Sequence, residues 1–274
     1  MFNQSKSKLH SDPRYGKAET PSAHEFTLEK YYDLYNRAVE GDEAIQTLVL
    51  GATPELRDIV LSYDHHLTTI DNDALALQEK TAMMHFKNSP HETIIISDWL
   101  TMDFPANSFD VILGDGALTA LKKDEQKTLL NILNHIIKPT GSIILREEAE
   151  VNHHIQFSPQ DMVHNYRSGQ YNIFDLFFGL RLHNKNYKGI NPETHRLRLK
   201  DFLNKLTEYR KNNIISRAEF EHLSHVAEEL EHTLLSKSEI EHILKGHFQP
   251  KEIIHDIGSG HLSPWYFFLH QPKE

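Results

Sequence analysis

The sequence predicts an α/β protein whose core is a doubly wound, mostly parallel sheet. Short apolar strands alternate with amphipathic helices between residues 46 and 149, and parallel neighbours in a sheet need such crossovers. One strand turns directly into a helix at Gly51, which is typical of a nucleotide- or nucleoside-binding βαβ unit. The segments 251–258 and 263–271 meet at a short turn and predict an antiparallel hairpin, which brings the sheet to seven strands.

The first part of the chain predicts an arm and a helix. Residues 1–25 are polar and show no hydrophobic period, so we expect a flexible arm. Residues 26–41 place apolar and aromatic side chains on one stripe that ends at Gly41, which predicts an amphipathic helix. Such stripes usually pack on a core, and this helix is expected to cover the sheet.

The first three strands carry distinctive residues where they end. Residues 47–50 form an apolar strand that stops at Gly51, and the next helix has Thr53 as its N-cap and Pro54 in its first position. The second strand, in HLTTIDND, ends in Asp71, roughly 20 residues further on, where such folds place the acid that hydrogen-bonds a ribose. The third strand, ETIIISDW, ends in an acid beside an aromatic ring.

Two further strands complete the parallel part of the predicted sheet. FDVILGDG supplies the fourth strand, with Gly114 and Asp115 at its carboxyl edge, beside the expected ligand crevice. A helix over about residues 123–137 stops before Pro139, and GSIILREEA forms the fifth strand.

The turn after the first strand indicates the kind of ligand. It reads G-A-T-P-E-L with one glycine, whereas a dinucleotide site needs G-x-G-x-x-G to bring bare backbone to a pyrophosphate. Glu55 also brings negative charge to the start of the helix, which disfavours a phosphate there. The crevice therefore suits a purine nucleoside without a phosphate, and S-adenosylmethionine (SAM) is such a ligand.

Four segments of the chain carry a resemblance to a known family. LGATPEL, TTIDND, ISDWLTMDFPANSFDVILGDGAL and PWYFFLH resemble the successive motifs of class I SAM-dependent methyltransferases, over residues 46–149 and 251–271. The resemblance implies a Rossmann-like fold with an antiparallel strand near the C-terminus, SAM as the cofactor, and methyl transfer to a small-molecule acceptor. The chain departs from the family pattern at Val49, Thr53 and Glu55, where the family has an acid and two glycines.

The resemblance assigns the purine and ribose part of SAM to four residues. Asp71 would accept hydrogen bonds from the ribose hydroxyls, although an acid there can also serve only the turn. Asn72 would meet the adenine edge or turn the chain. Asp98 would accept from the adenine amine with Trp99 against the ring, or would cap the next turn.

The methionine part of SAM would lie at the first and fourth strands. Gly51 and Ala52 would let it pass close to the backbone. Asp115, next to Gly114, would receive the methionine amino group or the acceptor, with helix capping as the alternative. In the family the N-terminal helix often lids this region, and Tyr31 would then touch the methionine end.

About 100 residues separate the fifth strand from the terminal hairpin, far more than a simple crossover needs. Their patterns are helical: one helix starts at Asn191-Pro192, and two capping boxes pair Ser216 with Glu219 and Ser236 with Glu239. We therefore expect one methyltransferase domain over residues 26–274, with a helical insertion over about 150–249 that packs over the crevice.

The sequence names no catalytic residue. Glu147, Glu148, His153 and His154 are candidates for a general base by position alone, because they follow the fifth strand. Methyl transfer depends mainly on holding donor and acceptor in contact, so no particular nucleophile is expected. The 20 histidines include no compact ligand pattern, and no metal is expected.

Composition limits the partners and the compartment. A formal charge of −10 and a pI near 6.0 make nucleic acid an unfavourable main partner, although residues 181–211 hold nine basic against three acidic side chains. A solvated helix face is the simpler account of that segment. No apolar run is long enough for a membrane span, so a cytoplasmic protein is expected. The oligomeric state stays open.

Three other functions remain alternatives. The depleted glycine motif is compatible with a SAM-binding regulatory module that has lost catalysis. The basic segment at 181–211 would suit an RNA or protein methyltransferase. An NAD(P)-dependent oxidoreductase would need the glycines that this turn lacks.

Overall fold

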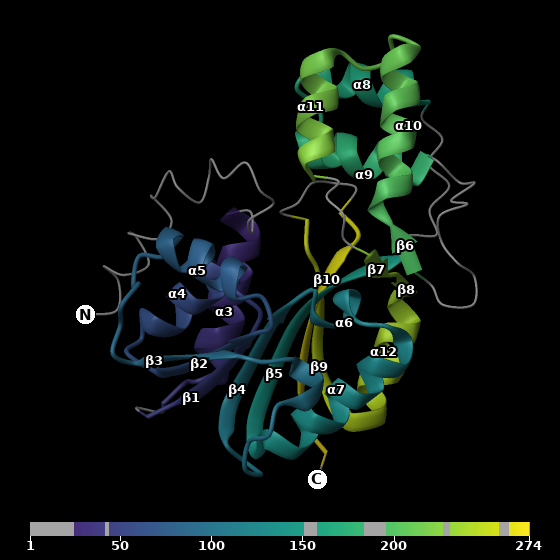
Figure 1. The fold of residues 1–274 in the computed structure, drawn as a ribbon. Coiled ribbons are helices and arrows are strands. Elements are labelled where there is room, and N and C mark those ends of the chain that lie inside the picture. Colours follow the sequence, from purple (N-terminus) through teal and green to yellow (C-terminus); the bar gives the residue numbers. More distant parts are fainter. Residues whose placement is uncertain are drawn as a thin grey trace.

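The computed structural model describes residues 25–41, 44–150, 158–183, 196–226, 231–257 and 263–273. They form a central sheet with helices on both faces and a group of helices beyond the carboxyl end of β5 and the amino end of β10 (Figure 1). The predicted N-terminal arm, apart from Glu25, lies outside the described residues.

The order of the main strands is β3-β2-β1-β4-β5-β10-β9, and the first five are parallel. The chain starts at β1 in the middle, moves outward to β3, and returns to the other side of β1 as β4. This reversal is the topological switch point, where open α/β sheets bind their ligands. The bounds are β1 Gln46–Leu50, β2 His66–Asp71, β3 Glu92–Ile96, β4 Phe109–Asp115 and β5 Ile137–Glu150.

The predicted hairpin closes the sheet and confirms the expected fold class. β9 (Phe248–His255) and β10 (Trp265–Pro272) are antiparallel to each other, and β10 is antiparallel to β5. The main path therefore holds seven strands, as predicted. A two-residue strand, β8 (Leu235–Ser236), also pairs with the end of β5.

Two hydrophobic cores lie on the two faces of the sheet because successive strand residues point to opposite sides. Val49 and Leu113 belong to the core under α3 and α4, whereas Leu48 and Ile112 belong to the core under α7 and α12. The helices are α3 Glu25–Ala38, α4 Pro54–Leu61, α5 Ala74–Met83, α6 Ala117–Ala120, α7 Lys123–Ile136 and α12 Lys237–His247.

The other helices form a separate group with a third core, which includes Leu176, Phe202 and Leu223. Figure 1 shows this group standing beyond the sheet, above β10 and a small antiparallel pair of strands, β6 and β7. α12 is not part of it, since α12 packs against α7 and β9. The bounds are α8 Pro159–Arg167, α9 Ile173–His183, β6 Arg196–Arg198, α10 Leu199–Lys211, α11 Arg217–Val226 and β7 Glu231–Thr233.

The predicted helix caps and helix starts were confirmed in part. Both predicted capping boxes are present, at Ser216 and at Ser236. Thr53 occupies the N-cap position of α4, but its side chain makes no capping hydrogen bond. The helix expected from Asn191 was wrong in its start: residues 191–195 lie outside the described residues, and a strand, β6, precedes α10. An antiparallel pairing with β7 overrides the helical pattern there.

His270 of β10 is a source of pH-dependent stability. It is 1% exposed, and neither ring nitrogen makes a well-formed hydrogen bond. Burial lowers the pKa of the imidazole to about 4, opposed in part by the backbone of Phe268. Protonation therefore favours the unfolded chain, and stability that is complete above about pH 6.5 is lost as the pH falls toward the folded-state value.

We predict that His270→Leu stabilises the protein, because it removes two buried polar atoms. The gain in the free energy of unfolding should be larger at about pH 5 than at about pH 7.5, by roughly 1–2 kcal/mol. Urea unfolding at the two pH values measures it, with His222→Gln on the exposed face of α11 as the control. Equal gains at both pH values would contradict the assignment.

Candidate functional site

The turn after β1 brings three of the predicted residues together. Gly51 has a φ of +99°, which favours glycine, and a Cβ added to it would lie 3.7 Å from the Trp99 ring and 3.8 Å from Asp71 Oδ2. The backbone N–H of Gly51 and the indole Nε1–H of Trp99 both donate to the carbonyl of Ile70, each at 2.9 Å. Strand β2 thus fixes the ring of Trp99 against the glycine turn.

The neighbouring acids have local partners. Asp71 is half-buried at the end of β2, and its Oδ1 accepts from the backbone N–H of Asp73 at 2.9 Å. Asn72, between Asp71 and Asp73, is exposed. Asp98 is exposed, and its Oδ1 accepts from the N–H of Leu100 at 2.8 Å, so it caps the short 3-10 helix η1 (Trp99–Thr101). The geometry at Asp98 is that of the capping alternative.

A second group of predicted residues lies on the adjacent strand. Leu50 pairs with Gly114, so Gly51 and Asp115 leave the sheet side by side at the switch point. A Cβ on Gly114 would lie 2.9 Å from Leu145 Cδ2, so packing alone favours glycine there. Ala52, after the glycine turn, is buried.

Tyr31 of α3 is fully buried, as the core-facing alternative expected. Its hydroxyl donates to the carbonyl of Gly114 at 3.0 Å, and its ring packs edge-on against Phe267. Burial, together with the nearby Asp115, raises the pKa of this hydroxyl well above its usual value. Tyr31 therefore attaches α3 to the end of β4.

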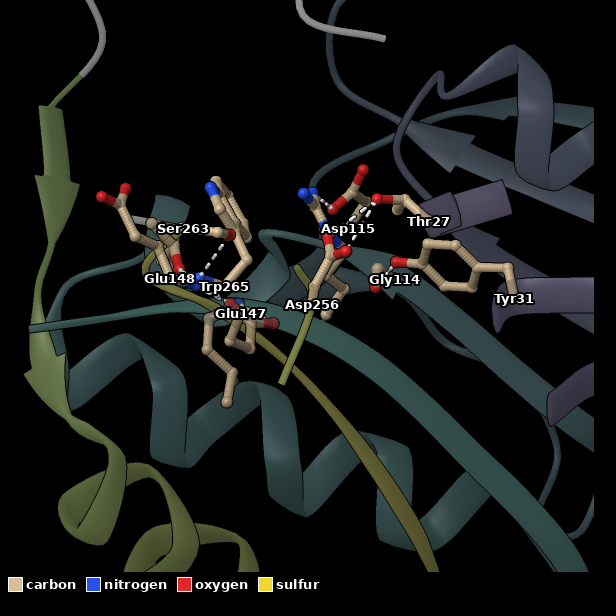
Figure 2. Close-up of polar contacts among 12 residues, drawn as sticks. Thr27, Tyr31, Gly114, Asp115, Glu147, Glu148, Asp256, Ser263 and Trp265 are labelled. Atoms are coloured by element: carbon tan, nitrogen blue, oxygen red, sulfur yellow. Dashed lines mark hydrogen bonds and ion pairs between the residues drawn. The ribbon is translucent and has the colours of Figure 1, made fainter. Parts of the chain in front are cut away.

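A buried ion-pair network lies beside these residues, and it was not identified from the sequence. Arg146 of β5 donates to Asp115 through Nη1 at 2.9 Å and to Asp256 through Nε at 2.6 Å. Its guanidinium carbon lies 4.3 Å from the centre of the Trp265 ring. Thr27 of α3 donates to Asp256 Oδ2 at 2.8 Å, and Figure 2 shows Thr27, Asp115 and Asp256 grouped beside Gly114 and Tyr31.

The network holds its charges in place. Burial opposes the charge of Arg146, but Asp115 and Asp256 outweigh it and raise the pKa of the guanidinium above its ordinary value. Two carboxylates against one guanidinium leave this end of the sheet with an excess of negative charge, which suits a cationic ligand. The one available signal was an arginine inside the apolar strand IILREEA, since buried charges are usually paired.

The prediction that Glu147 and Glu148 follow the fifth strand is wrong. Both residues lie inside this strand, because β5 continues to Glu150. Glu147 accepts from Leu118 N and from the N–H and hydroxyl of Thr119, each at 2.9 Å. Burial raises the pKa of Glu147 to about 7, although these three hydrogen bonds oppose the shift. It joins β5 to α6.

Glu148 joins the sheet to the helical group. Both of its oxygens are engaged, in an ion pair with Arg181 of α9 and in a 3.0 Å contact with His232 Nδ1 of β7. The other two candidates for a general base, His153 and His154, lie outside the described residues.

This strand order, with β10 antiparallel between β5 and β9, defines the Rossmann-like fold of class I methyltransferases. The structure of the protein PH0226 from Pyrococcus horikoshii is similar to this one. The match covers 97% of this chain and 99% of PH0226, with 13% identity and a TM-score of 0.56. A SAM-dependent methyltransferase from Clostridium acetobutylicum is similar to 90% of this chain over 92% of its own, with 11% identity and a TM-score of 0.55.

The N-methyltransferase NodS from Bradyrhizobium japonicum, solved with S-adenosyl-L-homocysteine (SAH), has the same fold. It is similar to 99% of this chain over 98% of its own, with 12% identity and a TM-score of 0.52. No protein-family model matches the sequence, and no curated protein matches it either. The likeness is therefore one of structure.

The described residues include neither a candidate membrane span nor a candidate metal site. No helix among them is long and apolar enough to cross a membrane. No cluster of three or more histidine, aspartate or glutamate side chains in the described ranges is placed to hold a metal ion.

We predict that Arg146→Met destabilises the protein by about 3–5 kcal/mol, because it leaves two buried carboxylates without their cation. Urea unfolding at neutral pH measures the change. The control is Lys138→Met, since Lys138 also contacts a carboxylate, Asp110, but is 35% exposed and should cost less than about 1 kcal/mol. A loss for Arg146→Met as small as that of the control would contradict a structural role for the network.

Proposed function

We propose that this protein binds SAM at the switch point and transfers its methyl group to a small-molecule acceptor. The observation that carries the proposal is the convergence of Gly51, Asp71 and Trp99 at the end of β1, next to Asp115 at the end of β4. These residues come from separate parts of the sequence, and the class I methyltransferase fold brings them to one edge.

The residues present fit a nucleoside with a cationic amino-acid tail. Asp71 offers a carboxylate to the two ribose hydroxyls, and Trp99 offers a fixed aromatic edge beside the glycine turn. The excess of carboxylates around Asp115 and Asp256 favours the positive sulfonium and ammonium groups. The same carboxylates would repel a pyrophosphate, so they also argue against NAD(P) as the ligand.

SAM, when bound, supplies an activated methyl group on a sulfonium. The task of the chain is then to hold donor and acceptor in line, which can provide much of the rate acceleration. The helical group beyond the carboxyl end of β5 and the amino end of β10 stands where an acceptor would enter, and Glu148 fixes one of its helices through Arg181. No catalytic residue is assigned, and His153 and His154 remain candidates by position.

A second candidate function is a SAM-binding module without turnover, which the single glycine of the turn favours. An RNA methyltransferase gains less support, because Arg181 of the basic segment is buried against Glu148 rather than exposed to a partner. Cytoplasmic location also stays part of the proposal.

Calorimetry with SAM, SAH and NADP⁺ tests the proposal. SAM and SAH should bind and NADP⁺ should not. Transfer of labelled methyl from SAM to a metabolite extract then separates an enzyme from a regulatory module. Binding of NADP⁺ without SAM would overturn the proposal, and SAM binding without any labelled product would favour the module.

Asp71→Asn should weaken SAM binding about tenfold, because an amide accepts hydrogen bonds from the ribose less strongly than a carboxylate. Asp103→Asn, at an exposed position after η1, serves as the matched control and should bind SAM like the unaltered chain. Equal affinities for the two variants would show that Asp71 serves only its turn.

A further inference from the structure

Glu55 is a buried carboxylate with an unused oxygen. It lies in the first turn of α4, directly after the glycine turn, and is 1% exposed. Its Oε1 has no hydrogen-bond partner. Leaving a buried polar oxygen without a donor is costly, so a carboxylate in this place calls for an explanation.

Two other buried acids do not share this condition. Asp58, one turn later on α4, accepts from the backbone N–H groups of His85 and Phe86 at 2.9 Å each. Glu147 accepts from three donors around α6. The chain thus supplies donors to both oxygens of Asp58 and Glu147. At Glu55 the hydrogen bond that acts on the carboxyl comes from its own backbone N–H, and Oε1 has no donor among the described residues, which indicates a partner from outside the chain.

The surroundings of Glu55 favour a cation. Burial raises the pKa of its carboxyl to about 7, and the charges that act on it are Asp115 and Asp58, which raise the pKa, and Lys80, which lowers it. Asp115 lies at the end of β4, next to the glycine turn that precedes Glu55, and its charge acts on the Glu55 carboxyl. A positive charge between them would relieve their repulsion.

We propose that Glu55 binds the α-ammonium group of the amino-acid portion of SAM and SAH. This inference rests on the proposed function and gives a role to one of the family glycine positions that an acid occupies in this chain. An ammonium group brings three N–H donors and a positive charge, which match the free lone pairs of Oε1. Because Oε1 is sealed from solvent, the cation reaches it only when neighbouring side chains move aside.

The test compares two ligands that differ by the amino acid. SAH and 5′-methylthioadenosine share the nucleoside and the thioether, but only SAH has the ammonium group. Glu55→Gln should weaken SAH binding on the order of tenfold and change the affinity for methylthioadenosine less than about twofold. Glu79→Gln, at an exposed position on α5, should change neither. Calorimetry measures the affinity of the unaltered chain and of both variants for each of the two ligands.

The outcomes separate a failure of the inference from a failure of the proposed function. Equal losses for both ligands would show that Glu55 acts through the fold, which overturns the inference but leaves the proposed function intact. No loss for either ligand would also overturn it. If the unaltered chain binds neither ligand, the proposed function and the inference both fail.

A measurement on the unaltered chain covers the case in which Glu55→Gln does not fold. Ionised Glu55 is needed for the ammonium contact, so the affinity for SAH relative to methylthioadenosine should rise between about pH 6 and pH 8. The Asp115, Asp58 and Lys80 charges act on both ligand complexes, and the ratio removes much of their effect. A ratio that stays constant over this range would overturn the inference.

Discussion

The salt bridges of Arg146 hold together the end of the sheet on which the candidate site is built. The guanidinium connects β5 to Asp115 at the end of β4 and to Asp256 after β9, while Trp265 of β10 covers its face. Thr27 adds α3 to the same network through Asp256. Four strands and one helix therefore meet at one cation, and the positions of the acids around the switch point depend on it.

The carboxyl end of the sheet divides into two regions with different tasks. Around Gly51, Asp71 and Trp99 the backbone turns are fixed while carboxylate oxygens remain available, as a ligand site requires. Along β5 the acids are already used, Glu147 by α6 and Glu148 by the helical group. Acids of similar sequence context thus differ in function because their donors differ.

Much of the fold followed from local patterns, whereas the buried network did not. Gly51, Asp71 and Trp99 lie at strand ends, and parallel strands bring such ends to one edge, so their grouping could be predicted. Arg146 and Asp256 lie 110 residues apart, and their contact depends on β10, which pairs with both β5 and β9. Periodicity also left the role of Tyr31 open, since core and lid positions look alike.

The placement of β10 sets the order in which this sheet can assemble. β9 precedes β10 in the chain, yet it reaches the rest of the sheet only through β10. Until that last strand enters, the long edge of β5 is unpaired and open to contacts with other chains. Completion of the sheet therefore requires pairings between distant segments, which slows folding. Solubility during folding depends on how quickly residues 265–272 pair with β5 and β9.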